Sequence, residues 1–323
     1  MKVAIVGYGN LGRGVEAALC AAPDMQAVGI FTRRDPATVQ SACGLPVYHM
    51  DALDGMADEI DVVINCGGSA TDLPKSTPAL AEKFHVVDSY DTHANILSHR
   101  ATVDAAARKG GKVAVISVGW DPGMFSINRL YAQSILQDSK SYTFWGKGVS
   151  QGHSDAIRRI EGVADARQYT VPIETAVQRV KDGEMPTFTA AEMHERVCYV
   201  AIKEGADAAA IEQAIVTMPN YFAPYKTTVH FVSLEELHRD HAGLPHGGKV
   251  ITTGKAATGS AHTIEYALTL QSNPDFTGSV LIAFARAAYR LGKQGEVGCK
   301  TAFDIAPIYL SPEKPEELYK HLL

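Results

Sequence analysis

Cysteine is scarce in this sequence, and its placement excludes several classes of protein. The 323 residues contain five cysteines, and no two of them form a C-x-x-C pair. An odd number of scattered cysteines argues against a disulfide framework and a zinc knuckle, and it indicates a reducing compartment. The five positions are Cys20, Cys43, Cys66, Cys198 and Cys299.

Long apolar runs and an excess of positive charge are also missing. No stretch approaches the ~18 apolar residues of a membrane span. The apolar run in the opening segment, MKVAIVGYGN, is too short for a signal peptide. The formal net charge of −6 argues against broad binding of nucleic acid or anionic membranes. We therefore expect a cytoplasmic protein that binds neither nucleic acid nor membrane.

The N-terminal part of the chain alternates between strand and helix patterns. Alternation of this kind predicts a doubly wound parallel sheet of the Rossmann type. The length indicates about two domains, at ~100–200 residues per domain. The expected strands cover 3–6, 25–31, 46–49, 60–66, 85–91 and 112–119, and a helix covers 95–110.

The pattern changes after residue 124, where strand-like segments stand among loops. These segments predict a second, α+β domain, and a long helix over 275–295 is expected to pack back on the first domain. The expected boundaries are 1–118 for the dinucleotide-binding domain, 119–265 for the second region, and 266–323 for the returning segment. The strand-like segments are 142–146, 166–171, 195–202 and 227–233.

A glycine-rich turn follows the first predicted strand and opens the first predicted helix. Its residues are Gly7, Tyr8, Gly9, Asn10, Leu11 and Gly12, a G-x-G-x-x-G pattern. In this context the glycines allow a tight turn, a close approach of pyrophosphate and close helix–strand packing. The pattern predicts a dinucleotide site, and three glycines in an ordinary loop are the alternative.

The end of the second predicted strand indicates the cofactor. Thr32, Arg33 and Arg34 stand where an acid would bind the ribose 2′-hydroxyl of NAD. Two guanidinium groups and a hydroxyl suit a 2′-phosphate, so we predict NADP(H). A solvated surface pair of arginines is the alternative. Asp35 follows one residue late, beside a proline that turns the chain away.

Three further turns follow the fourth, fifth and sixth predicted strands, at the edge where such sheets bind ligands. Asp91 and Asp121 would place two carboxylates beside a hydride acceptor. Carboxylates hold an ammonium group and accept its proton, which suits oxidation of an amine. A helix N-cap for Asp91 and an Asx turn for Asp121 are the alternatives. The turns contain Cys66, Gly67, Gly68 and Ser69; Ser89, Tyr90 and Asp91; and Val118, Gly119, Trp120, Asp121 and Pro122.

Several segments together resemble the meso-diaminopimelate dehydrogenase family. They are VGYGNLGRG, SYDTH, GWDPGMFSINR, FWGKGVSQGHSDAIRRI, LPHGGKVITTG and NPDFT, and the match runs from Lys2 to about Pro312. The resemblance implies an NADP-dependent oxidoreductase of lysine biosynthesis. Such an enzyme reversibly deaminates the D-centre of meso-2,6-diaminopimelate to L-2-amino-6-oxopimelate, with release of ammonia. It also implies a homodimer, with substrate binding and dimerisation in 119–265.

The resemblance also implies which residues bind. The three turns, Tyr8 to Leu11 and Thr32 to Arg34 would contact NADP(H). The D-centre would be surrounded by Asp91, Asp121, Trp145, Gln151 and Gly152, with the two acids as catalytic residues. The distal L-centre would be held by Thr170, Arg196, His246 and Asn273.

Purely structural roles remain open for three of these side chains, and two other functions remain open for the chain. Arg196 suits an ion pair between domains, His246 a turn, and Trp145 a core position. The rival functions are another NADP-dependent oxidoreductase, acting on a D-amino acid or a semialdehyde, and a non-enzymatic NADPH-binding protein. No metal site is expected, because His238, His241 and His246 have no Cys or acidic ligand placed to complete a shell.

Overall fold

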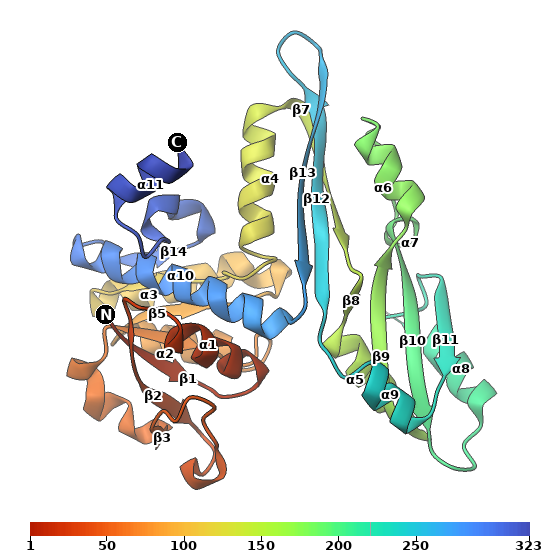
Figure 1. Cartoon of the computed structure of the whole chain (residues 1–323), viewed down its shortest axis with the longest axis horizontal. Helices are drawn as coiled ribbons and strands as arrows, with labels where there is room; N and C mark the ends of the chain where they lie inside the picture. The colour runs from red at the N-terminus through yellow and green to blue at the C-terminus, as the bar shows by residue number, and fades with distance from the viewer. Residues whose placement is uncertain (220) are drawn as a thin grey trace. The chain divides into compact units, whose positions relative to one another are not determined.

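The computed structural model describes residues 1–219 and 221–323, which divide into two units. Unit 1 comprises Met1–Ile127 and Pro274–Leu323, and unit 2 comprises Asn128–Asn273. In Figure 1, unit 1 contains the red, orange and dark blue segments, and unit 2 contains the green and light blue segments.

Unit 1 is built on a seven-stranded sheet in which every paired strand is parallel to its neighbour. The order β14-β6-β5-β4-β1-β2-β3 confirms the predicted doubly wound sheet, and it reverses between β1 and β4. Ligands of such sheets bind outside the carboxyl ends of the strands at this reversal. The strands are β1 (Lys2–Val6), β2 (Gln26–Thr32), β3 (Val47–His49), β4 (Val62–Asn65), β5 (His85–Asp88), β6 (Val113–Val115) and β14 (Gly298–Lys300).

Helices cover both faces of this sheet, and alternate side chains of β1 point to different helices. Val3 and Ile5 pack in a cluster with α1 and α10, whereas Ala4 and Val6 pack with α2 and α3. All four side chains are buried, as expected for a strand with apolar neighbours on both faces. The helices are α1 (Asn10–Cys20), α2 (Leu73–Ala81), α3 (Ile96–Gly110), α10 (Asn273–Lys293) and α11 (Pro315–Leu322).

The crossing of α1 and α10 depends on two glycines. A Cβ atom at Gly14 would lie 2.3 Å from the carbonyl oxygen of Pro274, and one at Gly278 would lie 2.5 Å from the carbonyl carbon of Gly14. Arg286 on α10 binds both carboxylate oxygens of Asp24, at 2.6 and 2.8 Å. Helix α10 is therefore attached to the first βα unit by backbone contact and by a bidentate ion pair.

Several strands of unit 1 are shorter than predicted, and β6 differs most from its prediction. The sequence predicted a strand over 112–119, but β6 ends at Val115. Beyond it the backbone N–H of Ile116 donates to Lys300 on β14 at 3.0 Å, and Ser117 has a φ of +57°. The apolar run continues because these residues are buried, although the extended conformation has ended.

The described residues of unit 2 form two smaller sheets and five short helices. One sheet has the order β11-β10-β9-β8, and the other has the antiparallel order β13-β12-β7. This confirms the predicted second, α+β domain. The strands are β7 (Gln137–Trp145), β8 (Gly148–Val149), β9 (Val163–Pro172), β10 (His194–Ile202), β11 (Thr227–Phe231), β12 (His246–Lys255) and β13 (Ala261–Leu270). The helices are α5 (Gln151–Arg158), α6 (Glu174–Lys181), α7 (Ala190–Met193), α8 (Ala208–Val216) and α9 (Leu234–Asp240), and α4 (Met124–Ile135) crosses the unit boundary.

Each sheet of unit 2 has its own apolar core. The four-stranded sheet packs on α5 and α8 through residues such as Cys198, Ile157 and Ile215. The three-stranded sheet packs on α6 through Phe144 and Val177. The long hairpin of β12 and β13, plain in Figure 1, was not predicted as a pair of strands.

No helix within 1–219 and 221–323 has the length and apolar character to cross a membrane.

Candidate active site

The glycine turn between β1 and α1 has the geometry that its spacing predicted. Gly7 has a φ of +88°, a conformation that side chains disfavour. A Cβ atom at Gly12 would lie 2.4 Å from the carbonyl oxygen of Gly7, so helix and strand pack too closely for any other residue. Gly9 is the N-cap of α1, and no atom lies within 4 Å of the place where its Cβ would be. An anionic group could therefore approach the backbone at Gly9.

Tyr8 turns inward rather than toward this approach. Its ring is 4% exposed, and its hydroxyl donates a hydrogen bond to the buried Glu16. The carboxylate of Glu16 also accepts the backbone N–H groups of Ala42 and Cys43, each at 3.1 Å. Burial alone would raise the pKa of Glu16, but its hydrogen bonds, from Ser41 first, lower that pKa below its usual value. Sequence reasoning missed Glu16, whose only signal was an acid among apolar residues in a helix.

The residues after β2 form a positive edge beside the glycine turn. The Thr32 hydroxyl accepts the backbone N–H of Arg34 at 3.1 Å, and Arg34 donates to the carbonyl of Tyr8. Arg33 forms an ion pair with Asp72 at 3.0 Å and is 77% exposed. Asp35 accepts the backbone N–H of Ala37 at 3.0 Å, so its carboxylate is used by its own turn.

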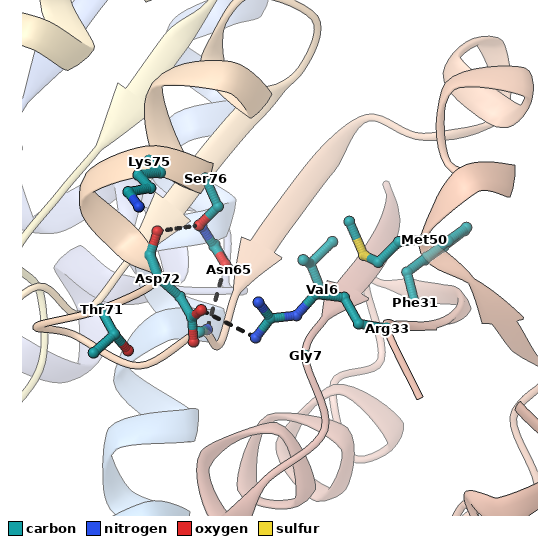
Figure 2. A pocket seen from close by; sticks show the side chains of 11 residues that line it. Val6, Gly7, Phe31, Arg33, Met50, Asn65, Thr71, Asp72, Lys75 and Ser76 are labelled. Atoms are coloured by element: carbon teal, nitrogen blue, oxygen red, sulfur yellow. Dashed lines mark hydrogen bonds and ion pairs between the residues drawn. The ribbon is translucent and has the colours of Figure 1, made fainter. Parts of the chain in front are cut away.

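A cavity of about 340 Å³ lies beside these residues. Figure 2 shows Arg33 and Asp72 directed toward each other, with Lys75 on the neighbouring helix. A backbone hydrogen bond from Gly68 and then the charge of Arg33 lower the pKa of Asp72. The predicted members of the lining are Gly7, Arg33 and Gly67, whereas Met50, Asn65, Thr71, Asp72, Lys75 and Ser76 were missed. Of the turn over 66–72, the sequence predicted only 66–69 to contact the cofactor.

In unit 1, a hydrogen bond connects the turn after β4 with the turn after β5. The backbone N–H of Asp91 donates to the Ser69 hydroxyl at 2.9 Å, and the Asp91 residue is exposed. Cys66 belongs to the first of these turns, and burial raises the pKa of its thiol to about 12. Cys66 is therefore a neutral thiol at the edge of the sheet, and it is no nucleophile at neutral pH.

The turn that carries Trp120 and Asp121 is closed by backbone contacts. The N–H of Met124 donates to Gly119 at 3.0 Å, and the N–H of Phe125 donates to Trp120 at 2.8 Å. The rings of Trp120 and Phe125 meet edge to face, with centroids 5.3 Å apart. Asp121 is partly exposed. Its carboxylate therefore stands on a turn that the surrounding backbone holds in place.

In unit 2, Arg196 and Thr170 lie opposite each other on β10 and β9. Arg196 is 7% exposed, and its Nη1 donates to the Thr170 hydroxyl. The guanidinium carbon lies 3.9 Å from the ring centroid of Tyr225. No ion pair joins Arg196 to an acid anywhere in the described residues, and within them its buried Nε has no hydrogen-bond partner.

The groups around Arg196 are neutral, because burial and the arginine charge disfavour further cations. These two causes lower the pKa of His153 and of His194 to about 4 in each case. Burial also lowers the pKa of His246. One unmatched cation among neutral rings and hydroxyls is suited to bind a carboxylate.

Two glycines allow Trp145 and His246 to lie close to Thr170. A Cβ atom at Gly146 would lie 2.1 Å from the carbonyl oxygen of Thr170, and one at Gly148 would lie 2.7 Å from the ring of His246. The backbone N–H of Trp145 donates to Nε2 of His194 at 2.9 Å, and the two rings stack. The Trp145 residue is 40% exposed, which is more than a core position would allow.

The remaining predicted residues of unit 2 stand at helix starts. Gln151 and Gly152 open α5, are exposed, and follow the N-cap Ser150. Asn273 opens α10, and its backbone N–H donates to Leu244 at 3.1 Å. Across residues 1–219 and 221–323, no group of three or more His, Cys, Asp or Glu side chains could hold a metal ion.

The curated proteins that match the chain along its length are of one kind. The family model described as the diaminopimelic acid dehydrogenase C-terminal domain matches residues 119–272. A meso-diaminopimelate D-dehydrogenase of Ureibacillus thermosphaericus is 57% identical over 323 residues, which is 100% of this chain and 99% of that protein.

Two solved structures are also similar over 100% of this chain and 99% of theirs. One is a multiply substituted meso-diaminopimelate dehydrogenase of Clostridium tetani with diaminopimelate, with a TM-score of 0.93 and 50% identity. The other is an engineered D-amino acid dehydrogenase bound to NADP⁺, with a TM-score of 0.86 and 46% identity.

Proposed function

The chain belongs to the family of meso-diaminopimelate D-dehydrogenases, and from that premise we propose how its own residues perform the reaction. The enzyme is an NADP-dependent amino-acid dehydrogenase of diaminopimelate and lysine biosynthesis. It catalyses the reversible oxidative deamination of the D-centre of meso-2,6-diaminopimelate. The products are L-2-amino-6-oxopimelate, ammonia and NADPH.

NADP(H) fits the glycine turn and the positive edge of unit 1. When bound, it supplies the hydride acceptor of the oxidation. The open backbone at Gly9 and the start of α1 would hold the pyrophosphate. Arg33 and Arg34 would hold the 2′-phosphate. The exposed ion pair of Arg33 with Asp72 contributes little, so a phosphate with about two negative charges would compete for Arg33 effectively.

Asp91 and Asp121 would act on the D-centre. Loss of hydride develops positive charge at the carbon and nitrogen, and carboxylates stabilise that charge. One of them would accept a proton from the ammonium group, and one would activate the water that hydrolyses the imine. The support for these roles is their placement, since both follow adjacent strands β5 and β6 at the carboxyl edge of the sheet.

The distal amino-acid centre would be held by unit 2. The single observation that supports this best is the buried guanidinium of Arg196, whose charge no acidic side chain matches within residues 1–219 and 221–323. A carboxylate bound by Arg196 and Thr170 would match that charge. The six residue types substituted in the Clostridium tetani mutant recur here in the same order and at the same spacing. In this chain they are Gln151, Thr170, Arg196, Pro245, His246 and Asn273.

The enzyme assay tests this function directly. With NADP⁺, the meso isomer of 2,6-diaminopimelate is expected to give NADPH, whereas the LL isomer gives none because it has no D-centre. The DD isomer is expected to react poorly, because its distal centre has the wrong hand for Arg196 and Thr170. NAD⁺ is expected to be a poor substitute. A folded, NADP-binding protein that is inactive with the meso isomer would contradict the proposal.

We also propose that the enzyme is a cytoplasmic homodimer. The support for a dimer is a row of exposed apolar side chains on α4, where Leu130, Tyr131 and Ile135 are 41%, 51% and 68% exposed. Exposed apolar groups of this size favour contact with another copy. Sedimentation is expected to give twice the chain mass of 34.7 kDa. A species of one chain mass at micromolar concentration would count against the dimer.

A further inference from the structure

Asp88 is a buried acid for which the reaction as described has no use. It is the last residue of β5 and has no exposed surface. Its Oδ1 accepts the backbone N–H of Tyr90 and that of Ser117, both at 3.0 Å. Its own carbonyl accepts the N–H of Val118 at 3.1 Å. One residue therefore binds the turn after β5 and the turn after β6 together.

The second carboxylate oxygen is fixed from the helices behind the sheet. The Thr77 hydroxyl on α2 donates to Oδ2 at 2.7 Å, and Nε2 of His99 on α3 lies 3.1 Å from the same oxygen. The His99 ring stacks on the ring of Tyr90, with centroids 4.1 Å apart. Because both oxygens are engaged, the carboxylate cannot rotate without breaking hydrogen bonds in a buried place.

Ser117 shows why the bond to Oδ1 matters. Its φ of +57° is left-handed, a conformation that is unfavourable for a residue with a side chain. Such a conformation persists only where the surroundings hold it, and Asp88 holds the Ser117 N–H. The serine hydroxyl has no hydrogen-bond partner in residues 1–219 and 221–323, so the backbone bond is the polar contact that fixes this residue.

We propose that Asp88 is a positioning residue that sets the two acids of the reaction relative to each other. Asp91 stands three residues after Asp88, and its N–H is fixed in turn by Ser69. Asp121 stands four residues after Ser117, beyond the change of direction that Asp88 stabilises. The inference rests on the proposed roles of Asp91 and Asp121. It adds that one buried carboxylate keeps their separation constant during turnover.

Substitution of Asp88 tests this inference. Asp88→Ala is expected to lower kcat about fivefold to tenfold, while the Kd for NADPH changes less than twofold. Asp88→Asn is expected to recover most of kcat, because the amide oxygen still accepts the Tyr90 and Ser117 N–H groups. A loss of kcat that asparagine restores is the signature of positioning, since general destabilisation would not follow this order.

Asp104→Ala is the matched control. Asp104 also lies in unit 1, on α3, and its Oδ1 accepts the N–H of Cys299 at 2.8 Å. That variant is expected to lose stability but keep kcat. If Asp88→Ala keeps kcat as Asp104→Ala does, or if Asp88→Asn is as slow as Asp88→Ala, the inference is wrong.

Two further measurements keep the result decisive. If Asp88→Ala does not fold, Thr77→Val removes the 2.7 Å bond to Oδ2 without a change of shape, and a threefold loss of kcat is expected. An unchanged kcat in Thr77→Val would then overturn the inference. If Asp121→Asn loses turnover while Asp88→Ala does not, the positioning role alone has failed. If Asp121→Asn turns over normally, the proposed roles of the acids have failed.

Discussion

Asp121→Asn is expected to lower kcat about a hundredfold or more, while the protein folds and still binds NADPH. Removal of general acid–base catalysis typically costs ~10²–10⁴-fold. Asparagine keeps the size of the side chain and its ability to accept a hydrogen bond, but it cannot take a proton or match a developing cation. The measurement is steady-state formation of NADPH from meso-2,6-diaminopimelate, with NADPH binding followed separately by fluorescence.

Asp61→Asn serves as the control for this change. Asp61 accepts the backbone N–H of Lys2 at 2.7 Å, just before β4 begins, so it lies at the amino end of the same sheet. It is expected to keep full turnover. Near-normal turnover in Asp121→Asn, measured beside that control, would make Asp121 a residue of the turn with no part in the chemistry.

Arg196→Met is expected to lower kcat/KM by about 30-fold to a few thousandfold, chiefly through KM for diaminopimelate. Loss of one partner of a buried, hydrogen-bonded charge pair costs ~2–5 kcal/mol of binding, and each ~1.4 kcal/mol is tenfold. The KM for NADP⁺ is expected to stay unchanged. Steady-state kinetics with each substrate varied in turn measure this difference.

The same substitution is expected to leave stability equal or higher. Arg196 is a buried cation whose pKa burial lowers, and no acid forms an ion pair with it in the described residues. Replacement of such a charge by an apolar side chain of similar length removes a desolvation cost. Arg167→Met is the control, since Arg167 lies on β9 and binds Asp165 at 2.9 Å. A clear loss of thermal stability with unchanged KM in Arg196→Met would make the residue structural.

The sequence predicted the sheet of unit 1 well because its signals are local. Gly7 and Gly12 need their conformation and contacts whatever else the chain does, and apolar runs mark strands covered on both faces. The prediction was poorer in unit 2. β7 begins at Gln137 rather than 142, because its first residues are polar and partly exposed. β13 is largely exposed, so no apolar alternation marks it.

The site residues were predicted unevenly for the same reason. Motifs and strand ends pointed to Arg33 and Asp121. The residues that surround these side chains, however, are distant from them in the sequence. Asp72 and Lys75 reach the cavity of Figure 2 from the next helix, which no short-range pattern specifies. Asp88 lies inside the strand that the sequence predicts over 85–91, and no motif marks it. Its importance lies in four hydrogen bonds, to α2, to α3 and to the turns after β5 and β6, and only the folded chain shows them.

The crossing of Gly14 with Gly278 has a consequence for synthesis on the ribosome. The core of unit 1 includes Leu281, Phe284 and Ala288 of α10, which emerge only after all of unit 2 has been translated. While unit 2 is made, the α10-facing side of the nascent N-terminal sheet is therefore covered by α1 without α10. The apolar surface that α10 later covers is therefore exposed to aggregation during the interval in which unit 2 is made.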